Sequence, residues 1–420
     1  ESPMRTLPAL VLLLALTQTA AADPLKLTIT GGKADQTNVV VRFPLPKGAD
    51  AIGNVVNLSD KTTVPLQVTG AAQSDDPIPA KYGVFVIPQL KAGQTLTGTT
   101  GTVNYFVAPP AFKFKSEDGK PTELVFAGTG QSRKVMQFFN LKHDPKEHYY
   151  TFKPFHNVYD PAKGEVMLTN TSSKNAKDGQ FPHHRGLFFG FNKITYGDKQ
   201  TADIWHGTDS VYSESVGHLG QEEGEVVGRH RPKINWHGKD GKPFATEERE
   251  VAAYATKGGT LIDWSTKLTT ELEKVRLDGD PQHAGFHFRA AQEVSKNGKE
   301  NTYYLRPDGK GKVGDTRNWD AKGKDEKTIN LPWDACSFVV ADKRYTVLRI
   351  NHPDNPKDAR GSERDYGRFG DYFEYDLTPK TPLKIKYRVW VQEGEMTVEQ
   401  CHALAAAFVS PPAVKVEAGK

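Results

Sequence analysis

Histidine is concentrated in one stretch of this sequence. The chain has 13 histidines, and eleven of them fall between His143 and His287. Imidazole is the side chain best suited to proton transfer near neutral pH, and it is also the commonest metal ligand in proteins. We therefore expect the chemistry of the protein to lie in this region.

The first candidate segment is Phe181-Pro182-His183-His184-Arg185-Gly186, with Trp205-His206-Gly207 farther along the chain. In extended backbone, His183 and His184 point to opposite faces, so only one of them should line a given site. We favour His184 as the catalytic residue, with Arg185 and Trp205 binding substrate. The alternative is that these histidines bond backbone carbonyls in a tight loop.

The second segment runs from Gln282 to Arg289 and alternates strictly. Strand geometry places His283, Gly285, His287 and Arg289 on one face, and Phe286 and Phe288 on the other. A His-x-His-x-Arg row indicates a ligand, because lysine, threonine and glutamate would serve equally well on a merely solvated face. We assign a catalytic role to His287 and substrate binding to His283 and Arg289.

The third segment is Asn351-His352-Pro353-Asp354-Asn355-Pro356, which leads to Arg364 and Tyr366. Its prolines predict a rigid loop that could position functional groups. We take His352 as a third catalytic candidate and Arg364 and Tyr366 as substrate-binding residues. The alternative is a stiff turn whose arginines pair with neighbouring aspartates.

Strands must position these residues, because β-type patterns dominate the sequence. Short β-branched runs separated by glycine, proline and aspartate predict a small N-terminal sandwich over residues 23–108. Ala108-Pro109-Pro110 interrupts the pattern and suggests a linker. Residues 109–420 then form a second domain, a large antiparallel supersandwich, so the predicted fold class is all-β.

Period-two alternation identifies individual strands of the second domain. They cover Glu165 to Thr169, Thr260 to Leu268, Tyr345 to Ile350 and Leu383 to Val391. The only convincing helix spans Thr397 to Phe408, with Thr397 as its N-cap and Gln400 three residues later.

Residues 1–22 have the pattern of a secretory signal, with Arg5 before an apolar run and Ala20-Ala21-Ala22 as the cleavage site. That run is shorter than the roughly 20 residues that span a bilayer. The pattern predicts export to the periplasm or beyond, without a membrane span. Such a compartment permits a Cys336–Cys401 disulfide, but two buried thiols are an equal alternative.

The charge pattern argues against nucleic acid as a partner. The net charge is +4 over 420 residues, and the lysines are scattered through turns. The sequence has no basic helix, stacked-aromatic RNA motif or zinc finger.

In combination, these strings resemble the bacterial family labelled PmoA-like, whose biochemical role is unestablished. The residues that carry the resemblance are Pro182 to Leu187, Trp205, Glu248-Arg249, Phe286-x-Phe288-Arg289, His352-Pro353-x-Asn355-Pro356 and Arg364-x-Tyr366-Gly367. The label implies a subunit of a membrane methane oxygenase, but such a subunit must cross the bilayer several times. We reject that function.

The second domain also resembles the galactose-mutarotase supersandwich, in which histidines on a concave sheet, an arginine and a carboxylate surround a sugar ring. The resemblance implies these roles for His184, His287 and Arg289. It leaves the carboxylate open among Asp371, Glu248 and Asp365.

Three functions compete. The first is an exported carbohydrate-active enzyme, an epimerase, lyase or hydrolase, that uses histidine acid and base chemistry and needs no cofactor or metal. The second is a zinc or copper site built from His283 and His287 with His184 or His352, although nearby arginines would oppose a cation. The third is a noncatalytic glycan-binding or envelope protein.

Overall fold

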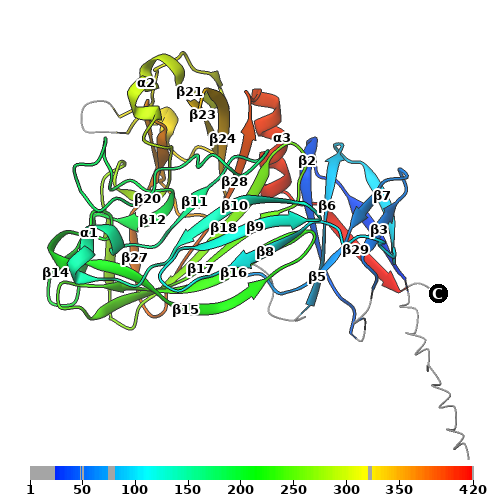
Figure 1. Cartoon of the computed structure of the whole chain (residues 1–420), viewed down its shortest axis with the longest axis horizontal. Helices are drawn as coiled ribbons and strands as arrows, with labels where there is room; N and C mark the ends of the chain where they lie inside the picture. Colours follow the sequence, from blue (N-terminus) through cyan, green and yellow to red (C-terminus); the bar gives the residue numbers. More distant parts are fainter. Residues whose placement is uncertain (1–23, 48, 50–51, 74–80, 320–323, 419–420) are drawn as a thin grey trace, which may run out of the picture.

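The computed structural model describes residues 24–47, 49, 52–73, 81–319 and 324–418. Antiparallel strands form nearly all of its regular structure and assemble into five sheets, which confirms the all-β prediction. The sheets fall into two groups that lie side by side, a smaller unit and a larger one (Figure 1). The predicted signal segment lies outside the described residues.

The smaller unit is a two-layer sandwich. One layer has the strand order β29 (Ala413–Ala418), β1 (Leu25–Thr30), β7 (Thr95–Gly101), β3 (Val55–Leu58), β4 (Thr63–Pro65), and the other has β2 (Gln36–Pro44), β6 (Lys81–Leu90), β5 (Gln67–Gly70). Leu25, Leu27 and Ile29 alternate inward along β1, so apolar alternation makes the core. The last strand, β29, pairs with β1, so both ends of the described chain meet in this unit, whereas the sequence boundary placed residues 413–418 in the second domain.

The larger unit packs two broad antiparallel sheets face to face. The first has the order β25 (Arg360–Arg364), β26 (Arg368–Tyr372), β20 (Ala284–Arg289), β12 (Leu187–Phe191), β11 (Phe155–Val158), β10 (Gln131–Phe139), β9 (Thr122–Gly128), β8 (Ala111–Lys115). The second has the order β15 (Tyr212–Glu222), β16 (Val227–His237), β17 (Pro243–Tyr254), β18 (Thr260–Thr269), β28 (Leu383–Glu393), β24 (Lys343–Asn351), β23 (Trp333–Val340), β21 (Tyr303–Arg306), β22 (Gly309–Lys310). A four-stranded sheet of β14 (Gln200–Ala202), β13 (Lys193–Tyr196), β19 (Val275–Asp278) and β27 (Tyr375–Leu377) lies beside them.

Aromatic rings fill the space between the two broad sheets. Phe286 of β20 packs against Trp264 of β18 and Tyr387 of β28, and Phe288 packs against Phe338 of β23. The predicted alternation of β20 is therefore correct, and its His287 and Arg289 face away from this core.

Three of the four strands predicted for the second domain are present as β18, β24 and β28. The fourth prediction, Glu165 to Thr169, is wrong, because this segment makes only two isolated bridges. The carboxylate of Asp160 accepts the backbone N–H groups of Lys163, Glu165 and Val166, which curls the chain into a turn.

The predicted C-terminal helix is confirmed as α3 (Val398–Val409). Thr397 caps it, and Thr397 and Gln400 form the reciprocal capping box. Leu404 of α3 joins a core cluster that contains residues of both units, and Ala407 joins the core of the smaller one, so α3 links the two units. The other helices, α1 (His148–Thr151) and α2 (Val294–Asn301), are short.

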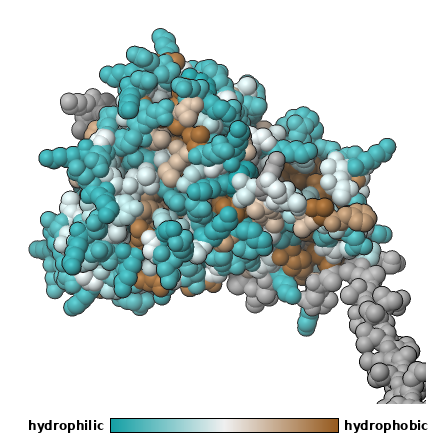
Figure 2. Space-filling view, in the orientation of Figure 1, coloured by the Kyte–Doolittle hydropathy of each residue, from teal (hydrophilic) through white to brown (hydrophobic). Residues whose placement is uncertain are grey.

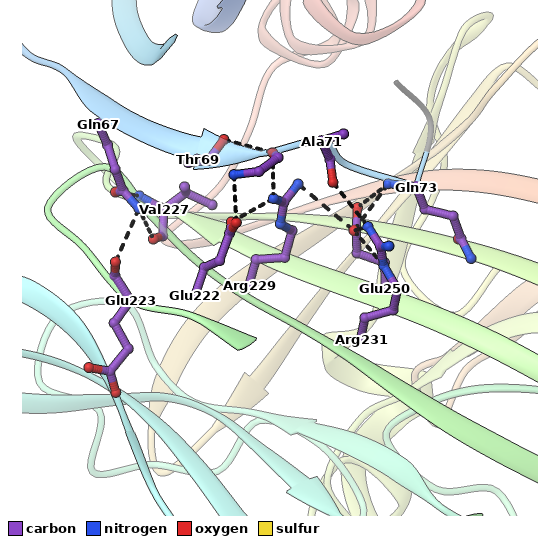
Figure 3. Close-up of polar contacts among 11 residues, drawn as sticks. Gln67, Thr69, Ala71, Gln73, Glu222, Glu223, Val227, Arg229, Arg231 and Glu250 are labelled. Carbon is purple, nitrogen blue, oxygen red and sulfur yellow. Dashed lines mark hydrogen bonds and ion pairs between the residues drawn. The ribbon is translucent and has the colours of Figure 1, made fainter. Parts of the chain in front are cut away.

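Polar contacts add to the junction between the units (Figure 3). Arg229 donates to Gly70 O and pairs with Glu222, while Arg231 donates to Ala71 O and pairs with Glu250. Among the described residues, no helix is long and apolar enough to span a membrane. On the face shown in Figure 2, hydrophilic side chains cover most of the larger unit, and hydrophobic ones gather mainly over the smaller unit.

Candidate functional site

Three histidine rings from three separate segments meet at one point of the larger unit. His183, His206 and His283 each offer one ring nitrogen, and these nitrogens all lie within 4.8 Å of one another. The ring centroids are 4.6 Å apart for His183 and His206, 4.7 Å for His206 and His283, and 5.6 Å for His183 and His283. All three side chains are half-buried. We call this group the histidine trio.

In two of these rings, Nδ1 is hydrogen-bonded to a carboxylate. His206 Nδ1 lies 2.8 Å from Asp203 Oδ2, and His283 Nδ1 lies 2.9 Å from Asp280 Oδ1. Asn192 donates to the second oxygen of Asp280 at 2.8 Å. A carboxylate on Nδ1 fixes the Nδ1–H tautomer, so Nε2 of His206 and of His283 keeps its lone pair for a ligand. Nε2 of His183 is buried and has no partner among the described residues.

Burial disfavours the charged form of His183 and of His283. It lowers the pKa of His183 to about 2, with the neighbouring His206 and Lys153 adding to the effect. Burial also lowers the pKa of His283, although Asp280 opposes it. Burial alone would raise the pKa of Asp280, but the His283 hydrogen bond and charge outweigh it and hold that pKa below its usual value. Neutral imidazole is the form that binds metal ions.

The backbone around His183 explains how its ring reaches the trio. Phe181 has a left-handed φ of +50° directly before Pro182, a strained conformation for an aromatic residue. The buried Lys153 then ties two of the segments together, because its Nζ donates to His183 O and to Trp205 O, each at 2.7 Å. Such strain persists where surrounding contacts enforce it, and it is concentrated at functional sites.

His184 and Trp205 form a layer beneath the trio. The His184 ring stacks on His283 with 5.2 Å between centroids, and it lies 5.6 Å from Trp205. Both side chains are buried, and His184 Nδ1 and Trp205 Nε1 have no partner among the described residues. The expectation that His183 and His184 face opposite ways is wrong, since their rings are 4.4 Å apart. The segment is a turn, so strand alternation does not apply.

His287 lies behind Trp205, 4.8 Å from its ring. Its Nε2 is 2.8 Å from Ala284 O, and its Nδ1 is 3.4 Å from Nη1 of Arg368. A carbonyl can only accept, so Nε2 donates and Nδ1 accepts. Both nitrogens are therefore engaged, which suits His287 to supporting the site rather than to moving protons.

Arg185 and Arg289, which were predicted to bind substrate, make different contacts. Arg185 is buried and donates to the carbonyls of Pro182 and Tyr149, so it anchors the His183–His184 turn to α1. Arg289 donates to Tyr366 O, and its guanidinium lies 4.5 Å from the centre of the Tyr366 ring. The Tyr366 ring is 5.2 Å from that of Phe181, which is 44% exposed, so the third segment does reach the site at this edge.

Arg364 and His352 are less closely connected to the trio. Arg364 donates to Asn318 Oδ1 and to Glu363 O. His352 packs against Phe408 of α3 at 5.3 Å, so the expectation that it joins the other histidines is wrong. Asn355 fixes this loop to β28 by bonding Lys386 O at 2.7 Å, which directs the loop toward α3.

The sequence patterns did not single out His183 and His206 as possible metal ligands. A usable signal was present in the repeated spacing Asp203-x-x-His206 and Asp280-x-x-His283, which places each carboxylate three residues before its histidine. Among the carboxylates that the mutarotase resemblance left open, Asp371 is buried, pairs with Arg349 and accepts a hydrogen bond from Tyr387.

Comparison with solved structures gives distant similarities. A glycosyl hydrolase family 38 protein of Enterococcus faecalis shares 10% identity at a TM-score of 0.42, covering 95% of this chain and 49% of the other. An alpha-mannosidase of E. faecalis V583 also shares 10%, at 0.37, covering 95% and 47%. YeaD of Salmonella typhimurium, provisionally assigned as a mutarotase, shares 9%, at 0.26, covering 69% and 97%. The chain thus spans about half the length of the first two.

Sequence comparison gives one family. No curated protein matches the chain. A family model, "Family of unknown function (DUF6807)", matches residues 131–406. This match does not test the PmoA-like resemblance, which stays a prediction. Because residues 131–406 make up more than half of the 420-residue chain, the protein belongs to the DUF6807 family.

Proposed function

We propose that this protein is a metal-dependent enzyme in which His183, His206 and His283 bind one divalent transition-metal ion, with zinc as the best fit. The observation that carries the proposal is the convergence of three imidazole nitrogens within 4.8 Å, two of them on rings held by carboxylates. Nitrogen ligands about 2.0–2.1 Å from a tetrahedral zinc ion lie about 3.3 Å apart. A small inward movement of the rings would close the site.

The arrangement fits a catalytic site better than a structural one. Structural zinc sites use four protein ligands, whereas three protein ligands leave a fourth position for water or substrate. A zinc ion at such a position lowers the pKa of bound water to about 7 and polarises carbonyl oxygens. The carboxylates of Asp203 and Asp280 would orient the ligand rings and increase their basicity.

The structure supplies the carboxylates that the sequence argument against a metal lacked. The arginines near the histidines would by themselves oppose a cation. Asp203 and Asp280 lie directly behind the trio and bring two negative charges to it. Their presence supports a divalent cation here, and it favours the metal hypothesis over metal-free acid and base chemistry by His184 and His287.

We further propose that the substrate is a carbohydrate and that the protein acts after export. An exposed ring beside a half-buried polar site suits a sugar, whose faces are partly apolar, and Phe181 supplies such a ring.

Export rests on the signal-like pattern of residues 1–22, and sequencing the N-terminus of secreted protein tests it.

Metal analysis of protein purified without a histidine tag tests the metal site. After dialysis against trace zinc, the wild-type protein should retain about one ion per chain, and His183→Ala, His206→Ala and His283→Ala should each lose most of it. His218→Ala, an exposed histidine on β15, is the matched control and should retain the ion. A metal-free wild-type protein, or equal metal content in all four variants, would contradict the proposal.

Activity assays test the enzymatic part. Incubation with a panel of sugars and glycosides, followed by product analysis, should show turnover that a chelator removes and zinc restores. Retention of a glycan without any product would assign the noncatalytic binding function instead.

A further inference from the structure

Three arginines form a row across one end of the larger unit. Arg364 of β25 lies opposite Arg368 of β26, and Arg368 lies opposite Arg289 of β20. Directly opposed residues of antiparallel strands share a face. Arg368 and Arg289 are almost completely buried. Like charges directly opposite each other are destabilising, so this pair needs a compensating anion.

Other buried arginines of this protein bind a carboxylate in one recurring way. In Arg249, Arg306, Arg349 and Arg388, Nε and Nη2 together bind the two oxygens of Glu247, Glu363, Asp334 and Asp263 respectively. This is the bidentate pairing that suits a guanidinium and a carboxylate.

Arg368 departs from this pattern at the same two atoms. Its Nε and Nη2 are buried and have no hydrogen-bond partner among the described residues. Its Nη1 makes only long contacts, 3.4 Å to Ser362 O and 3.4 Å to His287 Nδ1. Arg289 bonds carbonyl and amide oxygens alone, and its Nε also has no partner among the described residues. A buried charge without a counter-ion is costly, so a ligand is the natural partner.

A chain of side-chain contacts links Arg368 to the histidine trio. Its Nη1 contacts His287, the His287 ring lies 4.8 Å from Trp205, and the Trp205 ring lies 6.2 Å from His283. Burial lowers the pKa values of His184 and His283, and the charge of Arg368 adds to the effect. The bidentate edge of Arg368 is thus only a few side chains away from the proposed metal.

We infer that the substrate is an anion whose acid group, a carboxylate or a sulfate or phosphate ester, is bound by Arg368 with help from Arg289. This inference rests on the proposed function, since the metal would act on the same molecule. For a carbohydrate, the simplest such substrate is a sugar acid. The arginines would then set the orientation of the sugar relative to the metal.

Calorimetric titration of zinc-loaded protein tests the inference. D-Glucuronate should bind at least about tenfold more tightly than D-glucose, because bonds to a charged group are worth more than bonds to a hydroxyl. Arg368→Gln should weaken glucuronate binding at least about tenfold and leave the metal content unchanged, while Arg368→Lys should lose less. Arg276→Gln, which breaks a half-buried ion pair with Glu374, is the matched control and should bind as the wild type does. Acetate, sulfate and inorganic phosphate as competitors identify the preferred acid group.

The outcomes separate this inference from the proposed function. Wild-type protein that binds zinc but binds glucose as well as glucuronate, or that binds none of the four anions, overturns the inference and leaves the metal site standing. Unchanged glucuronate affinity in folded Arg368→Gln also overturns it. If Arg368→Gln fails to fold, the wild-type comparison of glucuronate with glucose decides. If wild-type protein binds no metal, the proposed function fails, and the same anion titration of metal-free protein still tests the arginine pair.

Discussion

At the scale of single residues, the proposed metal-ligand role of His206 and His283 depends on the carboxylates that bond their Nδ1 atoms. Asp280→Asn keeps the shape and an acceptor oxygen but removes the charge that makes His283 a stronger ligand. We expect zinc affinity to fall about 10- to 100-fold, since changes to such supporting groups have effects of this size. Competition with a chromophoric chelator measures it. Asp240→Asn, in the exposed turn before β17, is the control, and equal affinities in both variants would contradict the assigned role.

A second residue-scale prediction concerns a histidine pair away from the trio. His156 Nε2 lies 2.8 Å from His230 Nε2 in the core. Burial lowers the pKa of both rings, that of His230 to about 3, with Arg249 adding to the effect. At mildly acidic pH, His156 and His230 therefore bind protons in the unfolded chain but not in the folded protein. Their contribution to the free energy of unfolding is fully present above pH ~6.5. It is lost as the pH falls below that value, by about 1.4 kcal/mol per pH unit for each histidine.

Urea unfolding at several pH values between 7 and 5 checks this prediction. The double variant His156→Gln/His230→Gln keeps a hydrogen-bonding pair but removes both titrations, so its free energy of unfolding should fall less steeply with acid than that of the wild type. Identical slopes would show that the pair does not contribute to acid sensitivity.

Residue types predicted the region of the site but not all of its members. Clustering pointed to the segments whose histidines lie close together in the structure, and His283 was among the chosen residues. His184 was preferred to His183 on the assumption of extended backbone, whereas Phe181 starts a left-handed turn that brings both rings together. His352 failed because only long-range contacts decide that its loop lies against α3.

At the scale of elements, β20 and β26 must approach closely for His287 to fit. A Cβ on Gly370 would lie 2.4 Å from two atoms of the His287 ring. Gly370→Ala should therefore lower the free energy of unfolding by about 1–3 kcal/mol, as overpacking in a core does. Gly220→Ala on edge strand β15 meets no atom within 4 Å and should change it by less than about 1 kcal/mol. Urea unfolding compares them, and equal stabilities would contradict the close fit.

Strands and caps were the elements that sequence patterns predicted best. The alternation of β20 and the capping box of α3 both appear as expected. Glu165 to Thr169 has the same alternation but forms no strand, because the backbone N–H groups of Glu165 and Val166 donate to the Asp160 carboxylate. Hydrophobic periodicity indicates which face of a segment could be buried. It cannot show that a nearby side chain will accept the backbone N–H groups that strand pairing would otherwise use.

At the scale of the whole molecule, the last strand completes the first sheet. β29 pairs along all six residues with β1. A chain ending at Pro412 would leave β1 as a sheet edge, so we expect faster proteolysis in the smaller unit with unchanged zinc content in the larger. A chain ending at Ala418 is the control. Loss of zinc binding in the shorter chain would contradict this expectation and show that the shared core cluster couples the two units strongly.

The sequence does not reveal which strands pair when they lie far apart in the chain. Composition and turn spacing predicted two β-rich units, but nothing local indicated that residues 413–418 return to β1. The two cysteines illustrate the same limit, since a disulfide and two free thiols were equally compatible with the sequence. Both are buried free thiols in the structure.

Anomalous diffraction at the zinc absorption edge, from crystals grown with zinc, tests the central claim most directly. We predict one strong peak about 2.0–2.1 Å from Nε2 of His183, His206 and His283. No peak at the trio, or a peak bound only by other residues, would contradict the account.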